Sequence, residues 1–204
     1  MNRMEINQDN VKNENQRKIL DLINRSPSTR VSLARETGLT QSAVGIIINK
    51  LISNHIVIEV GKQDDIVMGR KPTFVDINPK WGYIIGISID HEGYEIGIVD
   101  IKGNIIGKIE KLDYDDHVQL SLDRIADTVN TIIGMNRIKP ENVIGVGVVA
   151  PGPIDSAAGQ ILNPPSFGSW HNLKLRDELE CRLPYQIFID HNSNALARAE
   201  HSIG

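Results

Sequence analysis

The spacing of the apolar residues changes partway along this chain, and that change limits how the chain can fold. Before Asn78-Pro79-Lys80, apolar residues recur every three or four positions, which is typical of amphipathic helices. After it, short apolar runs separated by turn residues are typical of strands. With 204 residues and 40 % apolar composition, the chain can bury more than one core. We therefore expect two domains, residues 1–79 and 80–204.

Three short helices are predicted in the first domain. The first spans residues 16–24 and follows a polar N-terminal arm. Thr29 and Thr40 have side chains that cap helix N-termini, so the second and third helices should begin directly after them. Gly38, which is free to take the left-handed conformation, should end the second helix.

A β-hairpin is predicted after the third helix, with strands at residues 56–60 and 73–77. The connection between these strands contains Met68-Gly69-Arg70-Lys71-Pro72, which gives the hairpin a long basic tip. Three helices followed by such a hairpin predict a winged helix-turn-helix domain.

The third helix is the element predicted to meet DNA, because the N-terminal side chains of such a helix reach base edges in the major groove. Gln41 can pair with adenine, Ser42 can bond to bases or phosphates, and Ile46 can touch a thymine methyl. A three-helix bundle that uses the same surface for protein contacts is the alternative. The candidate DNA-binding residues are Thr40, Gln41, Ser42, Gly45, Ile46, Lys50, Arg70 and Lys71.

The charges are divided between the two parts of the chain. Residues 1–80 carry 12 Lys and Arg against 9 Asp and Glu, a net charge of +3, whereas residues 81–204 carry 10 against 17, a net charge of −7. A basic domain can approach phosphates and an acidic one is repelled by them. A nucleic-acid partner is therefore expected for the first domain alone, despite the overall charge of −4.

The sequence predicts neither a membrane span nor a secretory signal, because its apolar runs are short and its first 18 residues are polar. The single cysteine, Cys181, cannot form an internal disulfide, and we expect it to be a small packing residue within a helix. A cytoplasmic protein is expected.

The second domain is predicted to be an α/β domain. Three strands, a helix, a strand, a Gly/Pro-rich stretch, a helix, a strand and a helix give the element order of one lobe of the ribonuclease-H-like, actin-type fold. The expected ranges are strands 83–89, 94–101, 105–112, 143–149 and 186–190, and helices 117–135, 173–183 and 192–201.

Several motifs resemble the ROK (repressor, open reading frame, kinase) family, especially its xylose-repressor-like branch. In the first domain these are Thr29-Arg30-Val31-Ser32-Leu33-Ala34, Gly38-Leu39-Thr40 and Gly69-Arg70-Lys71-Pro72. In the second, the stretch from Gly147 to Asp155, then Gly159, Asn163-Pro164-Pro165 and Trp170, resembles the strand and loop that border the sugar in the family.

The resemblance implies a transcriptional repressor that binds a double-stranded DNA operator and responds to a small sugar such as xylose. It covers about half of a typical ROK regulator, so it implies that the chain stops at Gly204 inside the first lobe of a sugar-kinase-like domain. It further implies a homodimer once the missing lobe is supplied, with no membrane partner.

The resemblance also implies that phosphate transfer has been lost. Kinases of the family carry Asp-x-Gly-Gly-Thr after the first strand, where this chain has Ser88-Ile89-Asp90-His91-Glu92, with an acid where phosphates would lie. The family's general base is the Asp of Asn-Asp-Ala-Asn, and Asn192 takes its place here; an amide cannot accept that proton but can still hydrogen-bond hydroxyls. No catalytic residue, metal site or cofactor is expected.

The candidate sugar-binding residues are Gly152, Asn163, Trp170, His191 and Asn192. For Trp170, anchoring the following helix is favoured over stacking on a sugar ring. For Asn192, hydrogen bonding to a sugar and capping a helix are equally weighted. The alternative functions are a ROK-type sugar kinase and a DNA binder that lacks a ligand response.

Overall fold

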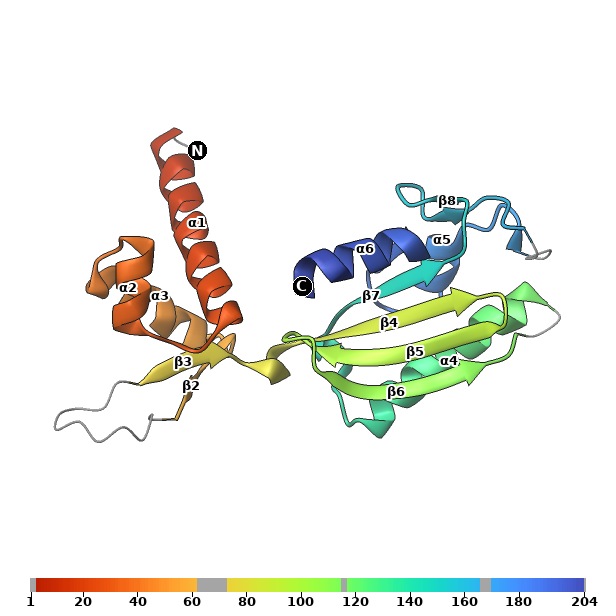
Figure 1. Cartoon of the computed structure of the whole chain (residues 1–204), viewed down its shortest axis with the longest axis horizontal. Coiled ribbons are helices and arrows are strands. Elements are labelled where there is room, and N and C mark those ends of the chain that lie inside the picture. The colour runs from red at the N-terminus through yellow and green to blue at the C-terminus, as the bar shows by residue number, and fades with distance from the viewer. Residues whose placement is uncertain (1–2, 62–72, 115–116, 166–169, 204) are drawn as a thin grey trace. The chain divides into compact units, whose positions relative to one another are not determined.

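The computed structural model describes residues 3–61, 73–114, 117–165 and 170–203 (Figure 1). Contacts divide the chain into two units, Met1–Trp81 and Gly82–Gly204. The first unit contains the helices α1 (Arg3–Arg25), α2 (Arg30–Thr37) and α3 (Gln41–Ser53). Its antiparallel sheet has the order β1 (Ser28–Thr29), β3 (Phe74–Ile77) and β2 (Val57–Val60), and a short 3-10 helix, η1 (Pro79–Trp81), ends the unit.

The helix α1 begins 13 residues before the predicted start, so the expected polar arm was wrong. Residues 3–25 contain neither Pro nor Gly, and Lys18 lies 2.8 Å from Glu14 one helical turn earlier, which favours a continuous helix. In the C-terminal part of α1, Ile19 and Ile23 are fully buried. The polar residues gave no hydrophobic periodicity from which the helical start could be read.

The helices α2 and α3 begin where Thr29 and Thr40 predict. Thr29 forms a capping box, in which its Oγ1 accepts from the Ser32 amide at 3.1 Å and the Ser32 hydroxyl accepts from the Thr29 amide at 3.0 Å. The Oγ1 of Thr40 accepts from the Ala43 amide at 3.2 Å. Gly38 lies between the helices at φ +73°, a left-handed conformation that suits glycine.

The first unit has a core of buried apolar side chains. All three helices and the two longer strands contribute to it, and each fully buried aliphatic side chain stabilises the unit by about 1.5–3 kcal/mol. The members are Ile19, Ile23, Leu33, Ala34, Val44, Ile48, Leu51, Val57, Val75 and Ile77.

The strand β1 was not predicted, because two residues are too few to show a period. Ser28 and Thr29 pair with Val75 and Phe74, which places α2 directly beside the sheet. The predicted hairpin tip, with Arg70 and Lys71, lies outside the described residues.

The second unit is built on a five-stranded sheet with the order β10-β7-β4-β5-β6. β4, β5 and β6 form an antiparallel meander, whereas β7 runs parallel to β4 and β10 parallel to β7. The strands are β4 (Tyr83–Asp90), β5 (Gly93–Asp100), β6 (Ile105–Leu112), β7 (Val143–Ala150) and β10 (Ile187–His191). The remaining elements are α4 (Val118–Met135), η2 (Pro140–Asn142), the hairpin β8 (Ile154–Asp155) and β9 (Gln160–Ile161), α5 (Leu175–Glu180) and α6 (Asn192–Ile203).

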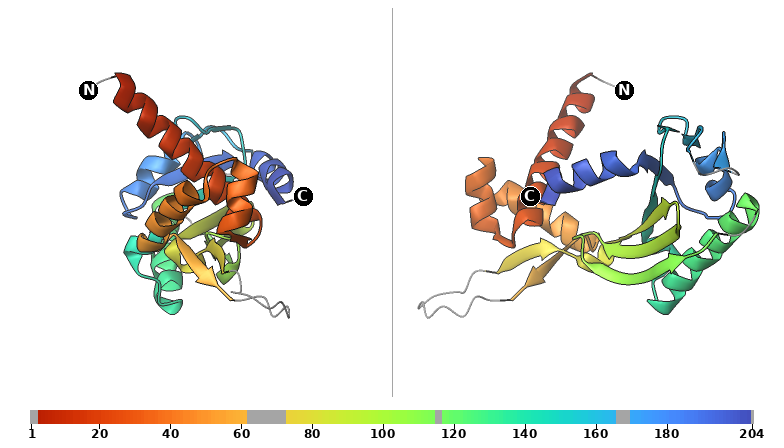
Figure 2. Two further views of the ribbon diagram at one scale, coloured as in Figure 1. Left: turned by 90° about the vertical axis from the view of Figure 1, so that its left-hand side faces the viewer. Right: turned by 45° about the vertical axis from the view of Figure 1, so that its right-hand side comes forward.

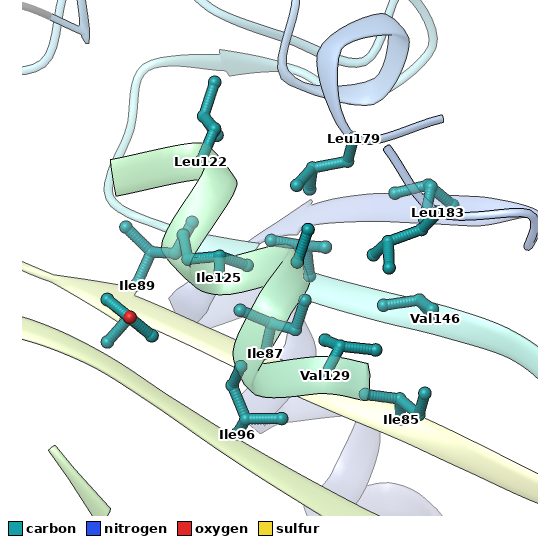
Figure 3. Packing of buried hydrophobic residues seen from close by; sticks show 14 of the residues in the cluster. Ile85, Ile87, Ile89, Ile96, Leu122, Ile125, Val129, Val146, Leu179 and Leu183 are labelled. Carbon is teal, nitrogen blue, oxygen red and sulfur yellow. The ribbon is translucent and has the colours of Figure 1, made fainter. Parts of the chain in front are cut away.

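The main core lies between one face of this sheet and the helices α4 and α5 (Figure 3). Alternate residues of β4 point to this face, which is why Ile85, Ile87 and Ile89 are buried while Ile84 is not. On α4, Leu122, Ile125 and Val129 recur at helical spacing and meet those strand residues (Figure 3). Leu179 and Leu183 extend the same core over Val146 (Figure 3).

The opposite face of the sheet is covered only in part, by α6, which contacts β10 and β7 (Figure 2). A groove of about 770 Å³ runs over this face, with Ala195 and Arg198 of α6 at one side. Three glycines line its floor, because Gly86 pairs with both Gly97 and Gly147 on the neighbouring strands. The three glycines place no side chains on the floor of the groove, and the residues that line it are mostly apolar.

Cys181 is exposed, so its expected role as a packing residue was wrong. It is the C-cap of α5, and the buried positions around it are Leu175, Leu179 and Leu183, which repeat every four residues and leave Cys181 outside. Within the described ranges, no helix has both the length and the apolar character needed to cross a bilayer.

Candidate functional site

The outward face of α3 carries the predicted DNA-binding residues that the structure describes in the first unit. Gln41, Ser42 and Lys50 are exposed, and Ile46 is 67 % exposed. Val44, Ile48 and Leu51 form the buried face of the same helix. The helix therefore packs on the rest of the unit through one face and exposes the side chains of the other.

Gly45 lies in the middle of this outward face. A Cβ atom placed on it would meet no atom of the described residues within 4 Å. Packing within the unit therefore does not require glycine here, although glycine costs a helix interior about 1 kcal/mol relative to alanine. A close approach from outside the unit is a physical reason for it.

Two residues that the sequence analysis did not select also belong to this face. Asn49 follows Gln41 and Gly45 at steps of four residues, so it lies on the same side of α3. The Nη2 of Arg30 donates to the Oδ1 of Asn49 at 3.3 Å and to the Oε1 of Glu59 at 3.0 Å. The four-residue step could have identified Asn49 from sequence; the contact with Arg30 joins elements distant along the chain and could not.

In the second unit, the turn between β4 and β5 is closed on itself. Asp90 pairs with Gly93, which leaves a two-residue turn of His91 and Glu92. The Oδ1 of Asp90 accepts from the Glu92 amide at 2.7 Å, so the chain's own carboxylate takes the amide that a phosphate would need. The Tyr114 hydroxyl lies 2.8 and 2.6 Å from the carbonyl oxygens of Asp90 and Gly93 and so holds the two ends of the turn.

The environment of Tyr114 keeps its hydroxyl protonated, so that it can donate to the turn. Burial raises the pKa of its phenol, and the nearby Asp90 carboxylate raises that pKa further. Tyr114 thus stays a neutral hydrogen-bond donor across the physiological pH range.

The junction of β10 and α6 assigns the capping role considered for Asn192 to a neighbouring residue. The Nδ1 of His191 accepts from the Ser193 amide at 3.1 Å, so the imidazole caps the start of α6. The Nδ2 of Asn192 lies 3.5 Å from the Ile89 carbonyl oxygen, at the outer limit of a hydrogen bond. Its Oδ1 is buried and has no hydrogen-bond partner among the described residues. Asn192 therefore keeps an acceptor for another group.

Asp190, two residues earlier, is already engaged. Its Oδ1 accepts from Asn194 Nδ2 at 3.1 Å, from the His191 amide at 2.8 Å and from the Ser156 hydroxyl at 3.3 Å. These bonds, that from Asn194 first, hold the pKa of Asp190 below its usual value. Asp190 is an ionised acceptor that orders the junction.

The structure brings together three of the predicted sugar-binding residues. Gly152 lies against His191, and a Cβ on Gly152 would overlap the imidazole ring, so only glycine allows this approach. Asn192 follows His191 directly. Gly152, His191 and Asn192 therefore form one cluster at the ends of β7 and β10.

The other two predicted residues are placed differently. Asn163 is exposed in the segment after β9. Trp170 is 3 % exposed, belongs to the main core, and meets Tyr114 edge-on with ring centroids 5.2 Å apart. Its ring has no open face for a sugar, so the structure favours the anchoring role. The described residues contain no cluster of three or more His, Cys, Asp or Glu side chains that could hold a metal ion.

The fold and these clusters can be compared with known proteins. Residues 84–204 match the family described as the ROK family. The chain belongs to the ROK family. The match runs from the second residue of β4 through α6 and so includes the Asp90 turn and the Asn192 junction.

Several ROK relatives align with both units. The chain is 30 % identical to the xylose repressor of Bacillus spizizenii over 200 residues, which cover 95 % of this chain and 50 % of the relative. It is 25 % identical over 200 residues to the DNA-binding transcriptional dual regulator NagC of Escherichia coli, covering 97 % of this chain and 48 % of that protein. The chain thus spans about half the length of the curated relatives that it matches.

Two solved ROK structures share the fold. A ROK family transcriptional regulator, a homologue of the Escherichia coli MLC protein, superposes with a TM-score of 0.70 and 21 % identity over 95 % of this chain and 49 % of its own. The ROK hexokinase of Thermus thermophilus superposes with a TM-score of 0.53 and 20 % identity over 60 % of this chain and 39 % of its own. The mixed α/β unit is therefore common to ROK regulators and ROK kinases, and fold alone does not separate them.

Proposed function

We propose that this ROK chain is a sequence-specific DNA-binding transcriptional repressor that responds to a sugar and does not transfer phosphate. In this proposal residues 1–79 are a winged helix-turn-helix domain, and residues 80–204 are the first lobe of a sugar-kinase-like domain. Relatives whose names state repression or DNA binding align across both units, which supports the assignment.

The observation that carries the proposal is the outward face of α3. It combines exposed Gln41, Ser42 and Lys50 with an exposed Ile46 and a glycine that the fold does not need. Polar side chains that read base edges, an apolar side chain for a thymine methyl and a close backbone approach are what a major-groove helix requires. Arg70 and Lys71 are proposed as phosphate contacts from the hairpin tip.

For the sugar we propose the cluster of Gly152, His191 and Asn192, and Asn163 in the segment after β9 stays a proposed further contact. The buried Oδ1 of Asn192 has an unused acceptor, which suits a sugar hydroxyl. The names of the relatives point to two candidate ligands, xylose and N-acetylglucosamine. Xylose is our first choice because the xylose repressor shares the higher identity.

Two features of the second unit support the proposed loss of phosphate transfer. The Glu92 amide is bonded to Asp90, and the Glu92 carboxylate adds negative charge at the turn where kinases cradle phosphate. Asn192 occupies the position proposed for a general base and cannot accept a proton at neutral pH.

The DNA-binding part is tested by selection. The full chain is incubated with a pool of randomised duplexes, bound duplexes are recovered over several rounds, and the enriched duplex is titrated against a scrambled one at several salt concentrations. We expect enrichment of a two-fold symmetric sequence and a preference of at least about 10³ over the scrambled duplex. No enrichment, or equal affinity for both duplexes, would contradict DNA-binding repression.

The ligand and kinase parts are tested on the same preparation. Calorimetric titration with xylose and with N-acetylglucosamine should give saturable heat for one of the two sugars. The sugar that binds should also lower the affinity of the chain for the selected duplex. A coupled assay for ADP release with ATP and either sugar should stay at the background rate. Saturable ADP release would contradict the loss of phosphate transfer, and absence of heat with both sugars would contradict the sugar response.

A further inference from the structure

The guanidinium of Arg30 hydrogen-bonds the side chain of Asn49, on the outward face of α3. Arg30 is the first residue of α2, and its Nη2 reaches Asn49 on α3 and Glu59 on β2. One nitrogen therefore joins three elements of the first unit. The Arg30 side chain is 31 % exposed and that of Glu59 51 %, so the group lies at the surface and remains reachable by a ligand.

The bond from Arg30 fixes which way the Asn49 amide points. A guanidinium can only donate hydrogen bonds, so the Asn49 atom that faces it is the carbonyl oxygen Oδ1. The Nδ2 group, on the other side of the same carboxamide, is then directed away from Arg30. Asn49 presents two donors, and one of the two lone pairs of its Oδ1 is already in use.

This orientation restricts what Asn49 can recognise on a duplex. Pairing with adenine needs the amide oxygen and nitrogen together, because adenine offers one donor and one acceptor in the major groove. Guanine N7 and O6, thymine O4 and phosphate oxygens are acceptors only. An amide that presents its Nδ2 donors suits this second group better than adenine, for which Oδ1 would have to accept a second hydrogen bond beside that from Arg30.

We propose that Asn49 is a further DNA-contacting residue of α3, which donates from Nδ2 to an acceptor on the duplex, and that Arg30 is the positioning residue that orients it. The inference rests on the proposed DNA-binding function. Glu59 keeps the Arg30 guanidinium beside α3, so Arg30 acts through Asn49 and not as a phosphate contact of its own.

The test uses the full chain, a duplex that it has selected from a randomised pool, and fluorescence anisotropy at several salt concentrations. Asn49→Ala and Arg30→Met should each weaken binding about tenfold, and the double variant should bind no worse than the weaker-binding single variant. Arg30→Met should leave the slope of log affinity against log salt unchanged, since a lost phosphate contact would lower it by about 0.9. Arg25→Met, at the exposed end of α1, is the matched control and should bind within twofold of the parent chain.

A second variant guards against a loss of folding. Asn49→Asp can still accept from Arg30 but has no donors, so it should unfold at or above the temperature of the parent chain and still bind DNA at least tenfold more weakly. Single-base-pair variants of the selected duplex then separate the two acceptor sources. If the acceptor is a base, Asn49→Ala no longer distinguishes the base pairs at one position of the duplex. If the acceptor is a phosphate, Asn49→Ala lowers the affinity for every duplex by the same factor.

Three results would overturn the inference while leaving the proposed function intact. These are parent-like affinity of Asn49→Ala and Asn49→Asp, additive losses in the double variant, and a lowered salt slope for Arg30→Met. A contact at which Asn49 selects adenine would also overturn it. If the parent chain itself has no sequence preference, the proposed function fails and the inference fails with it.

Discussion

At the scale of single residues, the feature that most needs an external explanation is Gly45. The helix would be more stable with alanine, and the described neighbours leave space for it. A structural glycine looks different: Gly38 has φ +73° and Gly152 lies against the His191 ring. Gly45 has neither property, which suggests that its role lies in an interaction outside the unit.

Replacing Gly45 with alanine should separate stability from binding. Gly45→Ala is expected to raise the free energy of unfolding by about 1 kcal/mol, because alanine is the better helix former. The same change should weaken binding to the selected duplex, because a methyl group would stand between the helix and the DNA. Urea denaturation and anisotropy measure the two effects.

The matched control is Gly134→Ala, which lies in α4 and also has no described atom within 4 Å of a Cβ. It should raise stability by about 0.5–1 kcal/mol without changing DNA affinity. Unchanged affinity of Gly45→Ala would show that this position does not approach the duplex.

A second prediction at this scale is that replacing Asn192 with aspartate, the residue of the family's kinases, lowers the stability of the chain. In Asn192→Asp a carboxylate oxygen would face the Ile89 carbonyl oxygen, where the amide nitrogen now lies 3.5 Å away. Two acceptors in a partly buried place should lower the free energy of unfolding by roughly 1–3 kcal/mol at pH 7.

Ser193→Asp is the matched control for the added charge, because Ser193 is exposed in the first turn of α6. A negative charge at a helix N-terminus is favourable, so its stability should match or slightly exceed that of the parent chain. Equal stability of Asn192→Asp and Ser193→Asp in urea denaturation would refute this account of the junction.

At the scale of elements, local side-chain chemistry predicted boundaries well, and long-range pairing was harder to predict. Thr29 and Thr40 start α2 and α3 through hydrogen bonds to amides three residues on, and the left-handed conformation of Gly38 ends α2. The strand β1 exists only because of its partner β3, so the sequence around Ser28 holds no signal for it. The capping role of the His191 imidazole, and with it the freedom of Asn192, also depends on how α6 begins in three dimensions.

The one-sided covering of the sheet gives a prediction at this scale. Ile187 and Phe188 are neighbours on β10, but Ile187 is 2 % exposed toward the core and Phe188 is 56 % exposed on the open face. Ile187→Ala should lower the free energy of unfolding by about 2–4 kcal/mol, whereas Phe188→Ala should change it by less than about 1 kcal/mol. Similar losses for both variants in urea denaturation would mean that the open face is covered in solution.

At the scale of the whole molecule, the two parts of the chain carry net charges of opposite sign. The net charge of +3 on residues 1–80 favours phosphates, and that of −7 on residues 81–204 does not. The family match covers the acidic unit, whereas the surface proposed to meet DNA lies in the basic one. A duplex is therefore expected to meet the first unit, and a sugar the second.

The most direct measurement of this account compares the parent chain with Gln41→Ala on the selected duplex and on its scrambled version at 0.15 M salt, a concentration at which screening of surface charges is already strong. We predict that the parent chain prefers the selected duplex by about 10³ or more, and that Gln41→Ala loses about tenfold of this preference while its affinity for the scrambled duplex is unchanged. Gln16→Ala on α1 should behave as the parent chain. Equal affinity of the parent chain for both duplexes, or a preference that Gln41→Ala leaves intact, would contradict the claim that the outward face of α3 reads DNA.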